Sequence, residues 1–253
     1  MTAPEPQSPG FELEAPRDLG GLLSESFDLY RRNFLRFLAM SVCVVVPVHA
    51  AVLGFGLKQF SGGYDSTSAP ASAWVPIAVQ VLVVGPLVAV MALHALQELA
   101  AGARRPRVGA SIQAGLDAFA VVFWPVLLSV LGEIAAIITI IGVFVLIVRW
   151  YFVPQVVVVE GARGTQAVRA SWEVTRNFGW RTAGLLLVGN IVYGFAGTLI
   201  STPVDAVARG VDSEAVGLAA TTLAETLAAA PIGIFVALVY FDLRSRQRAL
   251  VRT

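Results

Sequence analysis

The stretch AFAVVFWPVLLSVLGEIAAIITIIGVFVLIVRWYFVPQVVVV, residues 118–159, decides the fold of this 253-residue chain. Glu133 and Arg149 are its only charged residues. A membrane-spanning helix needs about 20 apolar residues to cross roughly 30 Å of hydrocarbon, so the stretch is too long for one span and suits two. We therefore predict two helices, 118–138 and 142–159, joined by a tight turn close to the outer membrane surface.

The remainder of the chain has the same apolar character. Hydrophobic residues make up 57% of the sequence and charged residues 14%, against roughly 25% charged residues in a soluble domain. Open strands are excluded because their backbone groups would be unsatisfied in lipid. We predict an all-α, polytopic membrane protein with six transmembrane helices in a single membrane domain, residues 18–246. The four spans that flank the central hairpin are predicted at 34–57, 74–97, 182–204 and 218–241.

The basic residues set the orientation, because segments rich in Lys and Arg stay on the cytoplasmic side. Fifteen arginines fall in four segments on one side of the six predicted helices, whereas only Lys58 and Arg209 fall on the other. We therefore expect a multi-pass protein of the bacterial plasma membrane with both termini in the cytoplasm. Residues 1–17 are Pro-rich and acidic and lack the features of a signal peptide, so we expect a disordered cytoplasmic tail. Residues 247–253 form a second predicted tail.

Three cytoplasmic segments precede a predicted hairpin and carry apolar residues at helical spacing, which is typical of amphipathic helices at a membrane interface. We predict these interfacial helices at about 19–33, 107–117 and 165–178. The order of residue types from Ser26 to Phe34 is close to that from Ser171 to Phe178. Three repeated units of interfacial helix plus hairpin are one interpretation, and ordinary interfacial anchoring is the other.

Arginines in and beside these segments are placed to contact anionic lipid headgroups, an interaction worth about 1 kcal/mol for each basic residue near the surface. The alternative is that they only set the topology. The predicted headgroup contacts are Arg31, Arg32, Arg104, Arg105, Arg107, Arg169 and Arg176.

Charged side chains inside the predicted spans need a separate explanation, because they are costly in hydrocarbon. With the hairpin turn at Ile141, Glu133 lies eight residues before it and Arg149 eight after it, a depth of about 12 Å for each. We predict a buried ion pair between them. A proton or anion site and water exposure near the turn are the alternatives. Glu225 and Asn190 form a second predicted polar cluster, and Glu225 is equally compatible with a solvated position.

Several kinds of chemistry find no support in the sequence. Cys43 is the single cysteine, so neither an internal disulfide nor a thiolate metal site is expected. His49 and His94 lie alone in predicted spans, where hydrogen-bonded packing is the preferred interpretation. We expect no catalytic residues, no metal, no cofactor and no nucleic-acid partner. Pro47, Pro86, Pro125, Pro154 and Pro231 fall in or near predicted spans, where proline tends to kink a helix.

Short motifs carry a resemblance to a known family. They are residues 22–34 (LLSESFDLYRRNF), residues 154–161 (PQVVVVEG), residues 167–172 (AVRASW) and residues 240–246 (YFDLRSR). With them the chain resembles the glycerophosphoryl diester phosphodiesterase membrane-domain family and related bacterial membrane proteins. Such domains can be fused to a soluble phosphodiesterase domain, which is absent from this sequence, so the resemblance implies an architecture rather than an activity.

The sequence favours a non-enzymatic membrane protein, a scaffold or accessory subunit whose cytoplasmic helices contact lipid. Membrane lipids and a membrane or cytoplasmic protein are the expected partners. The alternative is a small-molecule or lipid transporter that uses Glu133, Arg149 and Glu225. A cavity that contains one of these side chains would favour the transporter, and a tightly packed core would oppose it.

Overall fold

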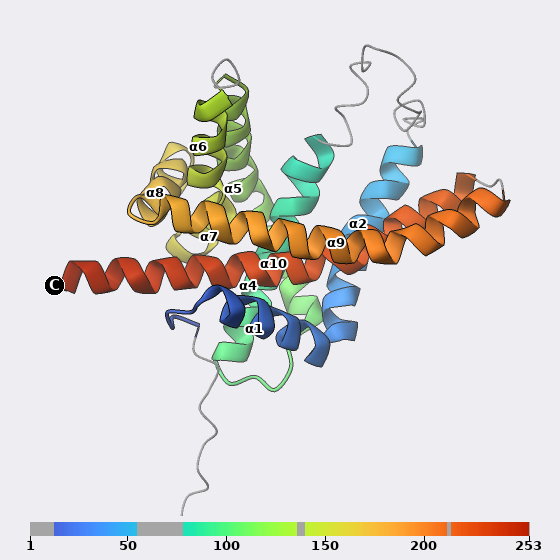
Figure 1. The fold of residues 1–253 in the computed structure, drawn as a ribbon, viewed down its shortest axis with the longest axis horizontal. Coiled ribbons are helices and arrows are strands. Elements are labelled where there is room, and N and C mark those ends of the chain that lie inside the picture. Colours follow the sequence, from blue (N-terminus) through green and yellow to red (C-terminus); the bar gives the residue numbers. More distant parts are fainter. Residues whose placement is uncertain (1–12, 55–77, 136–139, 212–213, 253) are drawn as a thin grey trace, which may run out of the picture.

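The computed structural model describes residues 13–54, 78–135, 140–211 and 214–252, and these are helical apart from short connections. Figure 1 shows their arrangement. In chain order the elements are α1 (Leu19–Arg32), α2 (Phe34–Gly54), the π-helix η3 (Gln80–Val84), α4 (Gly85–Ala100), α5 (Val108–Ala135), α6 (Ile140–Trp150), α7 (Val153–Glu160), α8 (Thr165–Thr175), α9 (Gly179–Val211) and α10 (Glu214–Arg252).

Local residues favour both ends of α1. The Asp18 carboxylate accepts a hydrogen bond from the Gly21 N–H at 2.8 Å, which satisfies one of the free donors at the start of α1. Arg31 and Arg32 occupy the last turn, where positive charge complements the helix dipole. α2 begins at Phe34, directly after the cap residue of α1.

The centre of the protein is α10. Every side chain from Ile234 to Leu243 is at most 6% exposed, so this part of the helix is covered all round by protein. It packs against α9, α2, α4 and α1, and Figure 1 shows α9 and α10 running side by side across α2 and α4. Gly189 makes the α9 contact close, because a Cβ at that position would overlap the Phe235 ring.

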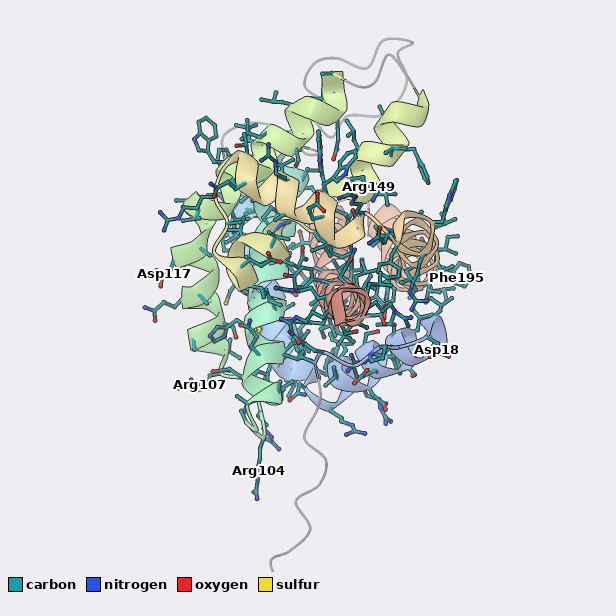
Figure 2. The ribbon with its side chains drawn as sticks, turned by 90° about the vertical axis from the view of Figure 1, so that its left-hand side faces the viewer. Asp18, Arg104, Arg107, Asp117, Arg149 and Phe195 are labelled. Atoms are coloured by element: carbon teal, nitrogen blue, oxygen red, sulfur yellow. The ribbon has the colours of Figure 1, made fainter. Side chains whose placement is uncertain are left out.

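The surface is as apolar as a lipid-facing surface must be. Large hydrophobic side chains are exposed on α2, α5, α6 and α9, and Phe195 on α9 is 67% exposed (Figure 2). A soluble monomer rarely exposes large apolar patches. Five segments are long and apolar enough to cross a membrane among the residues described: Phe34–Ala51, Gln80–Ala100, Val108–Ala135, Gly142–Glu160 and Glu225–Leu250. The structure is therefore compatible with a multi-pass membrane protein.

The all-helical architecture agrees with the prediction, but several boundaries differ. α5 is one continuous helix, so the interfacial helix expected at 107–117 is not a separate element. No proline interrupts it before Pro125, and Gly115 allows close packing against Met91. The span expected at 142–159 is divided into α6 and α7 beside Pro154, because a proline removes a backbone donor.

The two helices of the third predicted hairpin are longer than the apolar runs from which they were predicted, 182–204 and 218–241. α9 continues past residue 204 to Val211, and α10 extends from Glu214 through most of the tail expected at 247–253. α1 and α8 are separate helices near the expected 19–33 and 165–178, whereas the middle segment has no such helix. Three equivalent units are therefore not confirmed. A disordered tail was expected at residues 1–17, and residues 1–12 of it lie outside the described part of the chain.

Candidate functional site

A partly enclosed cavity of about 570 Å³ lies among η3, α4, α5, α6, α7, α9 and α10. This volume falls within the range of small-molecule sites, roughly 300–1,000 Å³. Most of its lining is aliphatic, from residues such as Val88, Val126 and Ile232. Its polar lining residues come from five different elements or their junctions: Gln80, Ser129, Glu133, Tyr151, Gln155 and Asn190.

Gln155 is the most deeply buried polar member of this cavity. The break between α6 and α7 places it in the first turn of α7, and the residue is only 2% exposed. Its Oε1 atom is buried and has no hydrogen-bond partner in the described part of the chain. A buried acceptor without a donor costs about 1–3 kcal/mol, so this oxygen is a natural contact for a ligand that carries a hydrogen-bond donor.

Glu133 also lines the cavity, but the structure does not bring it together with Arg149. The Arg149 guanidinium lies over the Trp172 ring, 5.1 Å from the ring centre, and close to Gly179 at the start of α9. No ion pair joins Glu133 to a basic side chain among the residues described.

The helix boundaries explain the difference. α5 ends at Ala135 and α6 begins at Ile140, so Ile141, the predicted position of the turn, lies inside α6. Glu133 lies close to the end of its helix and Arg149 lies near the far end of α6, which separates their levels by about 10 Å at 1.5 Å per residue. A long arginine side chain at that level can reach the arginine-rich end of the bundle instead.

Glu225 and Asn190, predicted as one cluster, occupy different places. The Glu225 carboxylate lies 3.0 Å from His49 Nε2, and His49 Nδ1 lies 2.9 Å from the Thr222 hydroxyl, which ties α2 to α10. Asn190 donates a hydrogen bond to the Leu186 carbonyl at 2.8 Å and lines the cavity. His94 Nδ1 lies 3.2 Å from the Ser111 hydroxyl between α4 and α5, as expected for a packing histidine.

Asp242 is a highly connected charged group that sequence reasoning missed. Its side chain is completely buried and accepts hydrogen bonds from the Arg17 N–H at 2.6 Å, from Arg181 at 3.1 Å and from Arg246 at 3.0 Å. Arg17 also pairs with Glu25 on α1. These contacts join the segment before α1, the start of α9 and the end of α10. The pattern Asp242 to Arg246, four residues apart on one helix, was the available signal.

A second network lies beside it. The Tyr240 hydroxyl donates to the Glu160 carboxylate at 2.9 Å, and Arg244 pairs with the same carboxylate at 3.1 Å. Glu160 and Arg244 line an open groove of about 660 Å³ between α7, α8 and α10, and exposed Arg169 and Arg248 lie along it. Because Glu160 and Glu173 line the same groove, its charge is mixed, and it is less selective for an anion than its arginines alone suggest.

The other predicted headgroup residues lie at the surface, most of them with a carboxylate nearby. Arg31 and Arg32 approach Asp28 at 3.6 and 3.8 Å, and Arg176 approaches Glu173 at 3.5 Å. Arg107 pairs with Glu98 at 2.8 Å. Arg104 and Arg105 are exposed in the turn between α4 and α5, and Figure 2 shows Arg104 projecting away from the helices. Their contact with lipid stays a prediction.

The Tyr30 hydroxyl, on α1, donates a hydrogen bond to the Leu227 carbonyl of α10 at 3.0 Å. Burial raises the pKa of this hydroxyl to about 12, because the charged phenolate would lose its water. In the described part of the chain, no group of three or more His, Cys, Asp or Glu side chains is arranged to hold a metal ion.

Comparison of the chain with protein-family models, with curated proteins and with solved structures finds no match.

Proposed function

We propose that the chain is a non-enzymatic, multi-pass protein of the bacterial plasma membrane that binds an amphipathic small molecule or lipid inside its helical bundle. α2, η3 with α4, α5, α6 with α7, α9 and α10 supply six spans in this proposal. Both termini lie in the cytoplasm, because the arginine-rich segments resist translocation. The family resemblance in the short motifs stays a prediction, and the proposal takes no activity from it.

The Gln155 Oε1, which is buried and has no hydrogen-bond partner within the described segments, is the observation that carries this proposal. A scaffold would be expected to fill the space between its helices, since protein interiors are packed as densely as organic crystals. Here the space is about 570 Å³ and is lined by Glu133 and by Gln155, whose Oε1 has no partner among the described residues. A ligand with an apolar body and a donor group would match both parts of the lining.

The test is native mass spectrometry of the protein extracted from its own membrane with the surrounding lipid. We expect the wild type to retain a bound small molecule or lipid. Ala89→Phe, which fills the cavity, and Gln155→Leu, which removes the acceptor, should each lower its occupancy by about tenfold, or 1.4 kcal/mol of binding free energy. Gln113→Leu is the matched control, because Gln113 is exposed on α5 outside the cavity.

Two results would oppose the proposal. One is a wild type that retains nothing, and the other is a ligand that Ala89→Phe and Gln155→Leu retain as well as the wild type does. A reproducible protein partner in place of a ligand would favour a scaffold or accessory subunit instead.

A second proposed function is lipid contact at the arginine-rich end, and exposed aromatic side chains favour it. Phe27 is 58% exposed on α1 and Trp180 is 88% exposed at the start of α9, positions from which aromatic rings can enter a membrane interface. In discs of mixed anionic and zwitterionic lipid, Arg31→Gln with Arg32→Gln should reduce the anionic lipid retained by the protein. Unchanged retention would leave these arginines with topology alone.

A further inference from the structure

The polar groups of the cavity differ in what they still offer a ligand. The Ser129 hydroxyl donates to the Val126 carbonyl at 2.7 Å, and the Asn190 amide donates to the Leu186 carbonyl at 2.8 Å. These donors are therefore engaged within their own helices. The Gln155 Oε1 and the Glu133 carboxylate are acceptors, and Oε1 has no partner within the described structure. The two acceptors, Gln155 Oε1 and the Glu133 carboxylate, suit a ligand that donates hydrogen bonds.

The charge of the lining points in the same direction. Among the described lining residues Glu133 is the only carboxylic acid, and no Lys, Arg or His joins it. Arg149, the nearest basic residue in the sequence of this hairpin, faces Trp172 instead. A carboxylate in an apolar wall is costly without a positive partner, so a cation that enters the cavity gains an interaction that a neutral molecule does not.

Two aromatic side chains complete the set. Trp150 and Tyr151 line the cavity at the end of α6, and Gly132 on α5 lets the Trp150 ring pack directly against that helix. Aromatic faces attract organic cations, and the attraction is stronger when the cation is desolvated. A carboxylate, an amide oxygen and two aromatic rings in an aliphatic wall are suited to an ammonium group attached to an apolar body.

We infer that the ligand of this cavity is an amphipathic ammonium compound, with its charged nitrogen between Glu133 and Gln155 and its apolar part along the aliphatic wall. This inference rests on the proposed function, because it assumes that the cavity binds a ligand. The ammonium can belong to a lipid headgroup or to a free amphipathic amine, since both present the same chemistry to the site.

The test compares decylammonium with decan-1-ol, which has the same chain and a neutral head. The full-length protein is placed in discs of phosphatidylglycerol, so that no lipid ammonium competes, and binding is measured by calorimetry. The Ala89→Phe variant supplies the background from partition into lipid. We expect decylammonium to bind the wild type about tenfold more tightly than decan-1-ol does.

Substitution of the carboxylate tests its role directly. Glu133→Gln should weaken decylammonium binding about tenfold and leave decan-1-ol binding unchanged. Asp117→Asn is the matched control, because Asp117 lies on the same helix and projects away from the other helices (Figure 2). If Glu133→Gln does not fold, the comparison of the two ligands on the wild type still decides the question.

The outcomes separate the two proposals. If both ligands bind the wild type equally and both are lost in Ala89→Phe, the cavity binds amphiphiles and the ammonium inference is wrong. If neither ligand binds more to the wild type than to Ala89→Phe, binding in the cavity is itself refuted. When the inference holds, added phosphatidylethanolamine will compete with decylammonium if the ammonium belongs to a lipid and will not compete if it belongs to a free amine.

Discussion

Asp242→Asn should be among the most destabilising single substitutions in this protein that leave side-chain size unchanged. The carboxylate is completely buried and accepts hydrogen bonds from one backbone N–H and two guanidinium groups. An amide keeps the shape but loses the charge, and its NH₂ group faces donors. Removal of one partner from a buried ion pair typically costs 3–5 kcal/mol. Arg181 and Arg246 are each 31% exposed and partly solvated, so we expect the lower end, about 3 kcal/mol.

The assay is the free energy of unfolding in mixed detergent micelles, with helical content as the signal. Asp28→Asn is the matched control, since the Asp28 carboxylate is 49% exposed and also lies near two arginines. Exposed pairs of this kind contribute about 0–1 kcal/mol. If Asp242→Asn costs no more than Asp28→Asn does, the three-way connection is not a stabilising feature and the reasoning from burial fails.

Two further substitutions test the packing and the ionisation of particular side chains. Gly189→Ala should destabilise the protein, because its Cβ would overlap the Phe235 ring. Gly184→Ala on the same helix meets no neighbouring atom within 4 Å and should stabilise the protein by up to about 1 kcal/mol through helix propensity. Changes of opposite sign in the free energy of unfolding would support the close α9–α10 contact, and equal changes would contradict it. Burial raises the pKa of Tyr30 to about 12 in the folded protein, above its ordinary value near 10. Because the phenol of the unfolded chain ionises first, the contribution of Tyr30 to the free energy of unfolding should be complete below pH 10 and should be lost as the pH rises from 10 towards 12. Between pH 9 and pH 11.5 the free energy of unfolding should fall less in Tyr30→Phe than in the wild type. An identical fall in both proteins would refute the assignment to Tyr30.

Features set by local sequence could be predicted well. The apolar runs gave the helical class, and Pro154 was expected to kink the fourth predicted span, which instead divides into α6 and α7 beside it. The motif that ends in Glu160 and Gly161 is a helix terminus, with Gly161 in the left-handed conformation at φ 68°. Each of these depends on residues that are neighbours in the chain, where hydrophobic periodicity and backbone preferences act directly.

Features that depend on distant residues could not be predicted in the same way. Asp242 and Arg17 are 225 positions apart, and no local pattern brings them together. The Glu133 and Arg149 pair was predicted from equal spacing about Ile141, but equal spacing fixes depth only when the turn is known. Since α6 already begins at Ile140, the level of Arg149 moves towards α8 and its guanidinium meets Trp172.

The contrast between Asp242 and Glu133 separates a charge that stabilises the fold from the charge to which the proposed function assigns binding. Both are acidic residues enclosed largely by apolar helices, but Asp242 is surrounded by the donors of three segments, and its charge is neutralised within the chain. Glu133 faces a cavity whose described lining supplies no basic side chain. A carboxylate kept without an internal partner lowers stability, and such a cost persists at sites where an external partner restores it. The energetics therefore direct a search for function to Glu133 and Gln155 and away from the better-connected charges around Asp242.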